Sequence, residues 1–350
     1  MVYRHFVFSG GYHIFVCILG SLQKLEEQNI IDLMDIDTMW CVSSGSFVAI
    51  TISLLKGYRI TQKDNSNDIY DFNWDILKNY ILDRPWNYLF YIPQFNIYDI
   101  CSKNGLYDES VSLQMLEPLL KLLDLSIDIT LKEFYEYTKV DCHFFSFDVY
   151  NFQYIDICYK TFPDMLLRNA MYVTSSIPFL SKPHIEYGKC FLDGGALFNY
   201  PINYCIKQIA NPSEILGYNT NLNTISDIEN PNFENSSLFY YIYSVAVLLY
   251  QKIYSLFICR EENTRCEGVY QDFGKYNEKP ESNDNSDIFY SEVSIVSDCN
   301  DEIQLPYTNY LTMFQDLYDF VMNYEKRKML WENGNTKTAI NKNYFYYINK

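Results

Sequence analysis

The sequence predicts an α/β fold of three layers, α/β/α, with a mainly parallel sheet, followed by a mostly helical C-terminal extension. Two units of strand, glycine-containing turn and helix follow one another within the first 56 residues. Consecutive units of this kind favour parallel strands, because each helix returns the chain to the starting edge of the sheet. Hydrophobic residues make up 48% of the 350 residues, which is enough to form a large core.

The first unit begins with a short aromatic and β-branched run over residues 3–8, which we predict to be a strand. Residues 9–11 interrupt the run with serine and two glycines, and residues 16–29 then have the apolar spacing of a helix. The second unit repeats this order with a strand over 37–42, a turn over 43–45 and a helix over 47–56. The two units predict neighbouring parallel strands at the start of the sheet.

The middle of the chain adds further strands after a less regular segment. Residues 61–125 are rich in polar and aromatic side chains, and we predict an insertion or cap over the sheet. This segment includes an amphipathic helix over 113–123 that contains Pro118. Strand-like sequence returns at residues 142–149, 154–159 and 189–193. We therefore assign residues 1–209 to a core domain that carries the functional residues.

Residues 210–350 are predicted to form an extension that packs on this core. An apolar run over 238–258 has nearly the length of a membrane span, but Gln251 and Lys252 interrupt it, so we predict a buried core helix instead. Residues 274–287 have the composition of a disordered loop. A last strand is predicted at 292–296 and an aromatic-rich helix at 310–330.

Charge and cysteine distribution exclude several classes of function. The formal net charge is −17, and such a field repels phosphate backbones, so no nucleic-acid partner is expected. The ten cysteines are spread singly along the chain without a CxxC pair, which predicts reduced thiols and neither a disulfide framework nor a metal site. The apolar stretch 6–22 is broken by residues 9–13, so no signal peptide is predicted. A cytoplasmic protein is expected.

The pattern Cys41-Val42-Ser43-Ser44-Gly45 lies where a predicted strand turns into a helix. A serine at such a sharp turn projects from the edge of the sheet with its hydroxyl exposed, which is the arrangement called a nucleophile elbow. Cys41 stands where the pattern G-x-S-x-G has its first glycine, and its side chain is small enough for the fold to accommodate. A serine that only caps the following helix is the alternative interpretation.

Asp193 is the candidate base that such a serine needs. It ends an apolar strand directly before Gly194 and Gly195, whose lack of side chains lets the backbone turn tightly. If its carboxylate lies beside Ser43, partial burial raises its pKa and lets it accept the hydroxyl proton directly. A plain Asp-Gly turn is the alternative interpretation.

None of the four histidines is predicted to be the base. No histidine follows Asp193, as the order serine, acid, histidine of the α/β-hydrolases requires. We interpret His13 and His143 as partly buried imidazoles whose hydrogen bonds are satisfied.

The turn Ser9-Gly10-Gly11 is the candidate site for negative charge. Backbone N–H groups in a glycine turn before a helix form a concave donor site, suited to the oxyanion of a tetrahedral intermediate. A phosphate-binding loop is one alternative, although the third glycine of a dinucleotide site and the lysine of a P-loop are missing. A plain turn is the other.

Together, these three segments resemble the patatin-like phospholipase family in order and spacing. The hallmarks of that family are a glycine-rich loop, an early G-x-S-x-G elbow and a D-G-[GA] segment. The segment FLDGGALFNYP also matches the continuation of the third motif through Asn199 and Pro201, and a serine and proline segment at 175–178 precedes it. The similarity covers about residues 3–206.

The resemblance implies a lipid acyl hydrolase of the phospholipase A or lysophospholipase type that works through an acyl-serine intermediate. Its substrate is then a phospholipid or a neutral acyl ester, met in the cytoplasm or peripherally on a membrane surface. No cofactor and no metal are implied. The implied roles are Ser43 as nucleophile, Asp193 as base, Gly10, Gly11 and Tyr12 as oxyanion hole, and Cys41, Gly45, Gly194 and Gly195 as support for the elbow and the DGG motif.

The glycine loop departs from the family pattern. The pattern G-G-G-x-[KR]-G requires glycine, a basic residue and glycine where this chain has Tyr12, Ile14 and Phe15. A bulky side chain is strained at a position that needs a positive φ, and the N–H donors then point elsewhere. The alternative prediction is therefore a catalytically silent relative that acts in lipid binding or in protein interaction.

Overall fold

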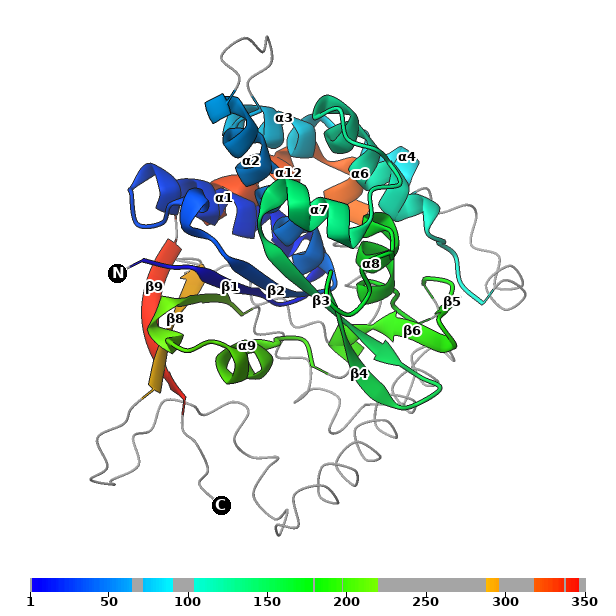
Figure 1. Ribbon diagram of the computed structural model, residues 1–350. Helices are drawn as coiled ribbons and strands as arrows, with labels where there is room; N and C mark the ends of the chain where they lie inside the picture. The colour runs from blue at the N-terminus through cyan, green and yellow to red at the C-terminus, as the bar shows by residue number, and fades with distance from the viewer. Residues whose placement is uncertain are drawn as a thin grey trace, which may run out of the picture. The chain divides into compact units, whose positions relative to one another are not determined.

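The computed structural model contains one mixed β-sheet with helices packed around it (Figure 1). It describes residues 2–64, 72–90, 104–178, 180–196, 198–219, 288–295, 318–336 and 338–345, with the backbone alone for 63–64, 288–295 and 338–345. In these residues nine strands have the order β5-β6-β3-β2-β1-β7-β8-β9, and β4 pairs with β3 outside this path. The strands are β1 His5–Phe8, β2 Thr38–Val42, β3 Asp141–Asp148, β4 Gln153–Ile157, β5 His184–Glu186, β6 Lys189–Asp193, β7 Ile215–Tyr218, β8 Ile288–Ile295 and β9 Thr338–Phe345.

Helices cover both faces of the sheet. Figure 1 shows most of the described helices on one side and α9 on the other. The helices are α1 Phe15–Glu27, α2 Ser44–Asp64, α3 Trp74–Asp83, α4 Trp86–Leu89, α6 Ser110–Leu122, α7 Leu131–Thr138, α8 Leu167–Thr174, α9 Ile202–Gln208 and α12 Tyr324–Thr336. Short 3-10 turns are η1 Tyr12–Ile14, η2 Leu33–Asp35, η3 Gly194–Ala196 and η4 Pro212–Glu214.

Parallel strands form the centre of the sheet. β1 pairs in parallel with β2 and with β7, β2 pairs with β3, and β7 pairs with β8. The antiparallel pairs β3–β4, β3–β6 and β5–β6 lie at one end of the strand order. Central strands are apolar along their whole length because both faces are covered, and Phe6, Val7 and Phe8 of β1 are accordingly fully buried. The predicted α/β class is confirmed.

Two strands meet end to end along one edge of β3. The first half of β3 pairs in parallel with β2, as far as Phe145 opposite Val42. The second half pairs antiparallel with β6, beginning with Ser146 opposite Asp193. Because β4 occupies the other edge of the same residues, β6 continues the line of β2 from the opposite direction. The last residue of β6 therefore lies beside the residue that follows β2, which is Ser43.

The sheet continues beyond residue 209, where the core was predicted to end. The side chain of Asn211 accepts a hydrogen bond of 3.3 Å from the N–H of Ser213, so the asparagine and proline at this point form a capped turn and not a linker. β7 follows at once and pairs with β1 along its whole length. Nearly all the described elements belong to one compact unit, made of Met1–Thr220, Phe289–Asp298 and Leu317–Asn343.

The C-terminal region contributes α12, which packs against α1. Glycine makes this approach possible on both helices: a Cβ at Gly20 would lie 2.2 Å from the carbonyl oxygen of Trp331, and one at Gly334 would lie 1.9 Å from that of Cys17. The indole N–H of Trp331 also donates a hydrogen bond of 2.9 Å to Gln23 Oε1. The two glycines and Trp331 thus hold α12 closely against α1.

The helix predicted at 310–330 differs from the structure in its bounds. Residues 318–322 are helical, Asn323 interrupts the helix, and α12 continues to Thr336. The interruption has a local cause, because Asn323 Oδ1 accepts hydrogen bonds from the N–H groups of Glu325 and Lys326, at 2.9 and 3.3 Å. These contacts are typical of an asparagine that caps a new helix. The last predicted strand, 292–296, corresponds to β8, and β9 was not predicted.

Helix α6 contains Pro118 in its interior, as the sequence predicted. A proline has no N–H, so the carbonyl four residues earlier, that of Gln114, loses its helical partner. The guanidinium of Arg84 donates a hydrogen bond to this carbonyl instead. Arg84, which follows the last residue of α3, thus satisfies the carbonyl group that Pro118 leaves without a helical partner.

Several predictions fall on residues outside the described ranges. These are the core helix at 238–258, the disordered loop at 274–287, parts of the cap at 65–71 and 91–103, and the start of the 310–330 helix. Within the described ranges, no helix has both the length and the apolar character that crossing a bilayer requires.

Candidate active site

Ser43 is the residue between β2 and α2, as the elbow prediction requires. Its φ angle is 51°, in the left-handed region that is strained for a residue with a side chain. Thr174, at the end of α8, holds this conformation: the Ser43 N–H donates to the Thr174 carbonyl oxygen at 3.2 Å and to Oγ1 at 3.1 Å. The Ser43 side chain is partly exposed. A strained turn thus holds Ser43 at a partly exposed position.

The two small residues of the elbow motif have different surroundings. A Cβ at Gly45 would lie 2.8 Å from the carbonyl oxygens of Phe8 and Ser9, so only glycine allows α2 to begin this close to the end of β1. Cys41 is fully buried in β2, where its thiol donates a hydrogen bond of 3.2 Å to the His143 carbonyl oxygen. Burial raises the pKa of this thiol, which therefore stays protonated. Cys41 fills the first motif position without disrupting the strand.

Asp193 lies beside Ser43 at the end of β6. Its Oδ2 accepts a hydrogen bond of 2.7 Å from Ser43 Oγ, and its Oδ1 accepts one of 2.6 Å from the N–H of Gly195. The carboxylate is buried, and burial raises its pKa from 3.8 to about 6, although both hydrogen bonds favour the charged form. A Cβ at Gly194 would lie 2.3 Å from the carbonyl oxygen of Phe145, so glycine is needed where the chain leaves the strand.

The glycine loop borders the same site. A Cβ at Gly10 would lie only 2.8 Å from the Cβ of Ser43, which shows how closely the loop backbone approaches the hydroxyl-bearing side chain. The Gly10 N–H donates to the Asn199 carbonyl oxygen at 3.3 Å, and the Gly11 N–H donates to Ser44 Oγ at 3.0 Å. Tyr12 has a φ angle of 51°, the strained conformation that the departure from the family pattern predicts. Both glycine donors are therefore engaged within the protein.

Asn199 and Ser44 connect the three segments, and the sequence alone did not assign them this role. Asn199 Nδ2 donates a hydrogen bond of 3.0 Å to the Gly10 carbonyl oxygen, while its own carbonyl accepts from Gly10. Asn199 thus ties the loop after Asp193 to the glycine loop. The sequence does place an asparagine six residues after the aspartate, as in the family motif that it resembles, but this spacing does not reveal which backbone groups the asparagine bonds.

Among the described residues, the contacts of the four histidines are with residues other than Ser43. His5 bonds Thr38, and His184 bonds Glu186. His143 was correctly predicted to be a satisfied imidazole: burial alone lowers its pKa, but hydrogen bonds to two aspartates outweigh burial and raise it to about 11. His13 differs from the prediction, because its buried Nδ1 has no hydrogen-bond partner among the described residues, and burial lowers its pKa to about 4. His13 packs on the ring of Phe320 instead.

A family model described as patatin-like phospholipase matches residues 6–206, which is more than half of the chain and contains the glycine loop, Ser43 and Asp193. The chain belongs to the patatin-like phospholipase family. This membership accounts for the order of the three segments along the sequence. It also agrees with the mixed sheet and surrounding helices described above.

Two viral proteins are similar to this patatin-like chain. It is 29% identical over 206 residues to probable lipid hydrolase 463L of Invertebrate iridescent virus 6, an alignment that covers 59% of this chain and 64% of the relative. It is 25% identical over 201 residues to an uncharacterized protein of Acanthamoeba polyphaga mimivirus, covering 57% of this chain and 60% of the relative. The matched region thus spans less than two thirds of the length of these relatives.

The solved structures that match this chain are more distant in sequence. VipD from Legionella pneumophila is 14% identical with a TM-score of 0.35, and the match covers 97% of this chain and 68% of that one. Full-length ExoU from Pseudomonas aeruginosa, solved in complex with SpcU, is 15% identical with a TM-score of 0.29, covering 62% of this chain and 44% of the matched chain.

Proposed function

We propose that this patatin-like protein is a lipid acyl hydrolase in which Ser43 is the nucleophile and Asp193 the general base. The observation that supports the proposal is the hydrogen bond of 2.7 Å from the partly exposed Ser43 hydroxyl to the buried Asp193 carboxylate. A pKa of about 6 leaves this carboxylate ionised at neutral pH yet basic enough to accept a proton during attack. Such a pair needs no histidine.

In each of its two half-reactions, the proposed reaction passes one proton through the same carboxylate. Ser43 Oγ attacks the ester carbonyl carbon while its proton passes to Asp193 Oδ2, giving a tetrahedral oxyanion. The ester C–O bond then breaks, and the proton moves from Asp193 to the oxygen of the leaving alcohol or lysolipid. Water attacks the acyl-serine in the same way, and the fatty acid leaves as Ser43 regains its proton.

The glycine loop is the proposed source of oxyanion stabilisation. The N–H groups of Gly10 and Gly11 lie next to Ser43, but they bond Asn199 and Ser44. A substrate oxyanion competes for the Gly11 N–H because it carries more negative charge than a serine hydroxyl oxygen. The rate therefore depends on exchange of one hydrogen bond for another in the loop.

A catalytically silent relative that binds lipid or protein is the second candidate. The engaged N–H groups of the loop and the strained Tyr12 favour it. In that case, the Ser43 hydroxyl remains hydrogen-bonded to Asp193, but it does not react because the glycine loop does not stabilise the oxyanion. The two candidates differ in one measurable property, the reactivity of Ser43.

Labelling with a fluorophosphonate probe tests the proposal, since the probe reacts readily only with an activated serine. We expect wild-type protein to label and Ser43→Ala to be unlabelled. Ser213→Ala is the matched control, because Ser213 is also partly exposed but lies in the η4 turn, and it should label like wild type. Equal labelling of wild type and Ser43→Ala would favour the silent relative.

The substrate and its location follow from the same proposal. We expect acyl esters of phospholipids or neutral lipids, reached from the cytoplasm or from a membrane surface to which the protein binds peripherally. The net charge of −17 gives no attraction to an anionic bilayer, so a membrane contact has to be apolar. Nucleic acid is not an expected partner for the same reason.

A further inference from the structure

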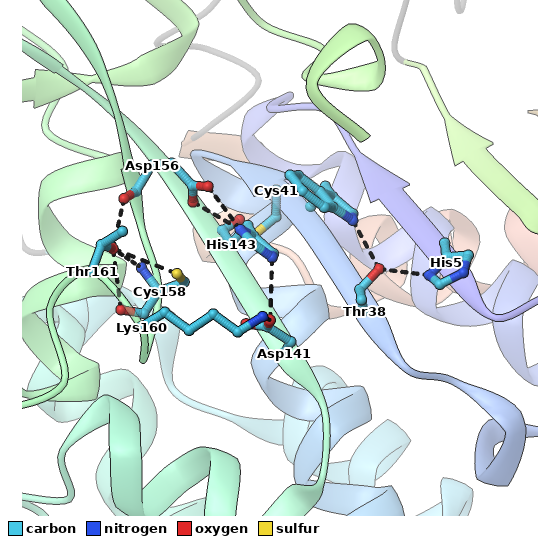
Figure 2. A network of polar contacts seen from close by, with 10 residues as sticks. His5, Thr38, Cys41, Asp141, His143, Asp156, Cys158, Lys160 and Thr161 are labelled. Carbon is cyan, nitrogen blue, oxygen red and sulfur yellow. Dashed lines mark hydrogen bonds and ion pairs between the residues drawn. The ribbon is translucent and has the colours of Figure 1, made fainter. Parts of the chain in front are cut away.

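A second group of reactive side chains lies toward the opposite end of β3 from Ser146 and Asp193 (Figure 2). Asp141 and His143 come from β3, and Cys158 follows the last residue of β4. All three are buried, and their candidate ligand atoms lie within 4.8 Å of one another. The hydrolytic reaction proposed above does not use these residues.

The strand register explains why these residues meet. β3 and β4 pair antiparallel with Phe145 opposite Asp156. Two residues further along, the same register places His143 opposite Cys158, and directly opposite residues share one face of the sheet. Asp141 lies on that face as well, because it precedes His143 by two residues. Two carboxylates, an imidazole and a thiol therefore gather on one face.

One spacing in this group matches the coordination sphere of a small divalent cation, and all three candidate ligand atoms lie within 4.8 Å of one another. Zinc with bonds of about 2.0–2.3 Å holds the atoms of a tetrahedral site about 3.3–3.8 Å apart. Asp141 Oδ2 lies 3.6 Å from His143 Nε2. Asp141 Oδ1 is buried and has no hydrogen-bond partner among the described residues, an arrangement that calls for an explanation in a folded protein.

We propose that Asp141, His143 and Cys158 bind a zinc ion, which holds β4 and the turn after it against β3. An imidazole nitrogen, a thiolate sulfur and a carboxylate oxygen are a donor set that zinc accepts, whereas magnesium and calcium prefer oxygen alone. Binding releases the protons carried by Nε2 and Sγ. Three protein ligands leave the fourth position to a water molecule.

Asp156 orients the imidazole for this role. Both of its carboxylate oxygens lie 2.9 Å from His143 Nδ1, so the other ring nitrogen, Nε2, faces Asp141. The ring of Trp40 stacks on that of His143 at a centroid distance of 3.8 Å and an angle of 3°, which fixes the plane of the imidazole. A carboxylate on the far nitrogen of a metal-binding histidine is a frequent feature of zinc sites.

Lys160 occupies part of the space near the proposed ion. Its Nζ lies 2.7 Å from Asp141 Oδ2, and 61% of its side chain is exposed. A side chain with this exposure can turn into solvent when a cation enters, so the zinc ion replaces the positive charge that Lys160 otherwise supplies. Removal of Lys160 should therefore strengthen metal binding.

Cobalt(II) titration of the chelator-treated full-length protein tests the proposal. Cobalt bound to a thiolate has a sulfur-to-metal absorption band in the near ultraviolet, and we expect one equivalent to produce it and zinc to abolish it. We expect a zinc dissociation constant of about 1 µM or lower and a rise in melting temperature of about 5 °C at saturation. A dissociation constant above about 1 mM would overturn the proposal, because surface carboxylates alone bind that weakly.

Variants identify the residues that bind the cobalt ion and so give rise to the absorption band. Cys158→Ser should lose the band, whereas Cys190→Ser, a change at a buried cysteine of β6 outside the group, should keep it. Asp156→Asn should weaken zinc binding about 10- to 100-fold, and Lys160→Ala should strengthen it. If Cys158→Ser does not fold, Asp141→Asn takes its place. A folded variant of either ligand that keeps wild-type affinity contradicts the site.

Discussion

The two ends of β3 place buried aspartates in opposite electrostatic settings. Near its second half, the partners of the Asp193 carboxylate among the described residues are a hydroxyl and a backbone N–H, so burial dominates and raises its pKa to about 6. At its start, burial also tends to raise the pKa of Asp141, but hydrogen bonds and charge from His143 and Lys160 outweigh it, and the pKa is lowered. Neutral partners leave a carboxylate basic, whereas cationic partners hold it ionised.

The largest effect that tests this contrast is the loss of the base. Asp193→Asn keeps the shape of the side chain but removes its ability to accept a proton. We expect ester hydrolysis to fall by about 10²- to 10⁴-fold, the contribution typical of general acid–base catalysis. Initial rates on a short-chain acyl ester measure this loss.

A buried aspartate without a proposed catalytic role is the control. Asp148 ends β3 and bonds the N–H groups of Tyr150 and Cys190. Asp148→Asn should lower stability without a comparable loss of rate per folded molecule. Equal rates for wild type and Asp193→Asn would remove Asp193 from the proposed mechanism.

The next effect concerns the other end of the strand. His143→Gln leaves Asp156 and Asp141 without their shared cation, and breaking a buried ion pair by removing one partner costs about 3–5 kcal/mol. We expect this loss in urea unfolding with a chelator present. Fluorophosphonate labelling of Ser43 in the folded variant should stay within about twofold of wild type. A large loss of labelling at unchanged stability would show that the two ends are not independent.

A smaller effect is the pH dependence of stability that Asp193 imposes. Its pKa is about 6 in the folded protein and near 3.9 in the unfolded chain, so the unfolded state loses its proton first as pH rises. Folding stability therefore decreases between about pH 4 and pH 6, by up to about 3 kcal/mol. Asp193→Asn has no such loss.

Urea unfolding of wild type and Asp193→Asn measures this difference. The variant should be more stable than wild type at pH 7.5, and the gap should shrink toward pH 3.5. A gap that does not vary with pH would mean that the carboxylate is not destabilised by its buried position.

The smallest expected effect is at the glycine loop. Ser44→Ala removes the hydroxyl oxygen that accepts the Gly11 N–H, and the freed donor no longer has to exchange partners during the reaction. Since one such hydrogen bond contributes about 0.5–1.5 kcal/mol, we expect the rate to rise about 2- to 10-fold. A fall in rate would instead indicate that Ser44 holds the loop in position.

Local sequence patterns were enough to predict β1, β2, β3, β4, β6 and β8, the turn at Ser43 and the turn after Asp193, but not β5, β7 or β9. Glycines, serines and apolar runs act within a few residues, so their consequences are visible in the sequence. The contacts of Thr174 and Asn199 were not predictable in this way, because each depends on how a helix end or a loop meets a strand distant in the chain.

The group around His143 is a second example of contacts that local sequence patterns cannot predict. Both strands that carry it were predicted, at 142–149 and 154–159, whereas the sequence did not indicate the metal site that we propose there. Cys158 and His143 are 15 positions apart, a spacing typical of no metal motif, and they meet only because of the register between β3 and β4. The strand β7, which follows residue 209, was missed for a related reason, since its place in the sheet depends on its pairing with β1.

Because β2 and β6 meet end to end, the contact between Ser43 and Asp193 depends on the register of β6 along β3. A shift of β6 by one residue along β3 would carry Asp193 about 3.3 Å away and turn its carboxylate to the opposite side. Substitutions in the β5–β6 hairpin that change this register would therefore abolish the proposed activity of Ser43, while the helices and their packing stay as they are. Turnover thus reports on a misalignment that circular dichroism would not detect.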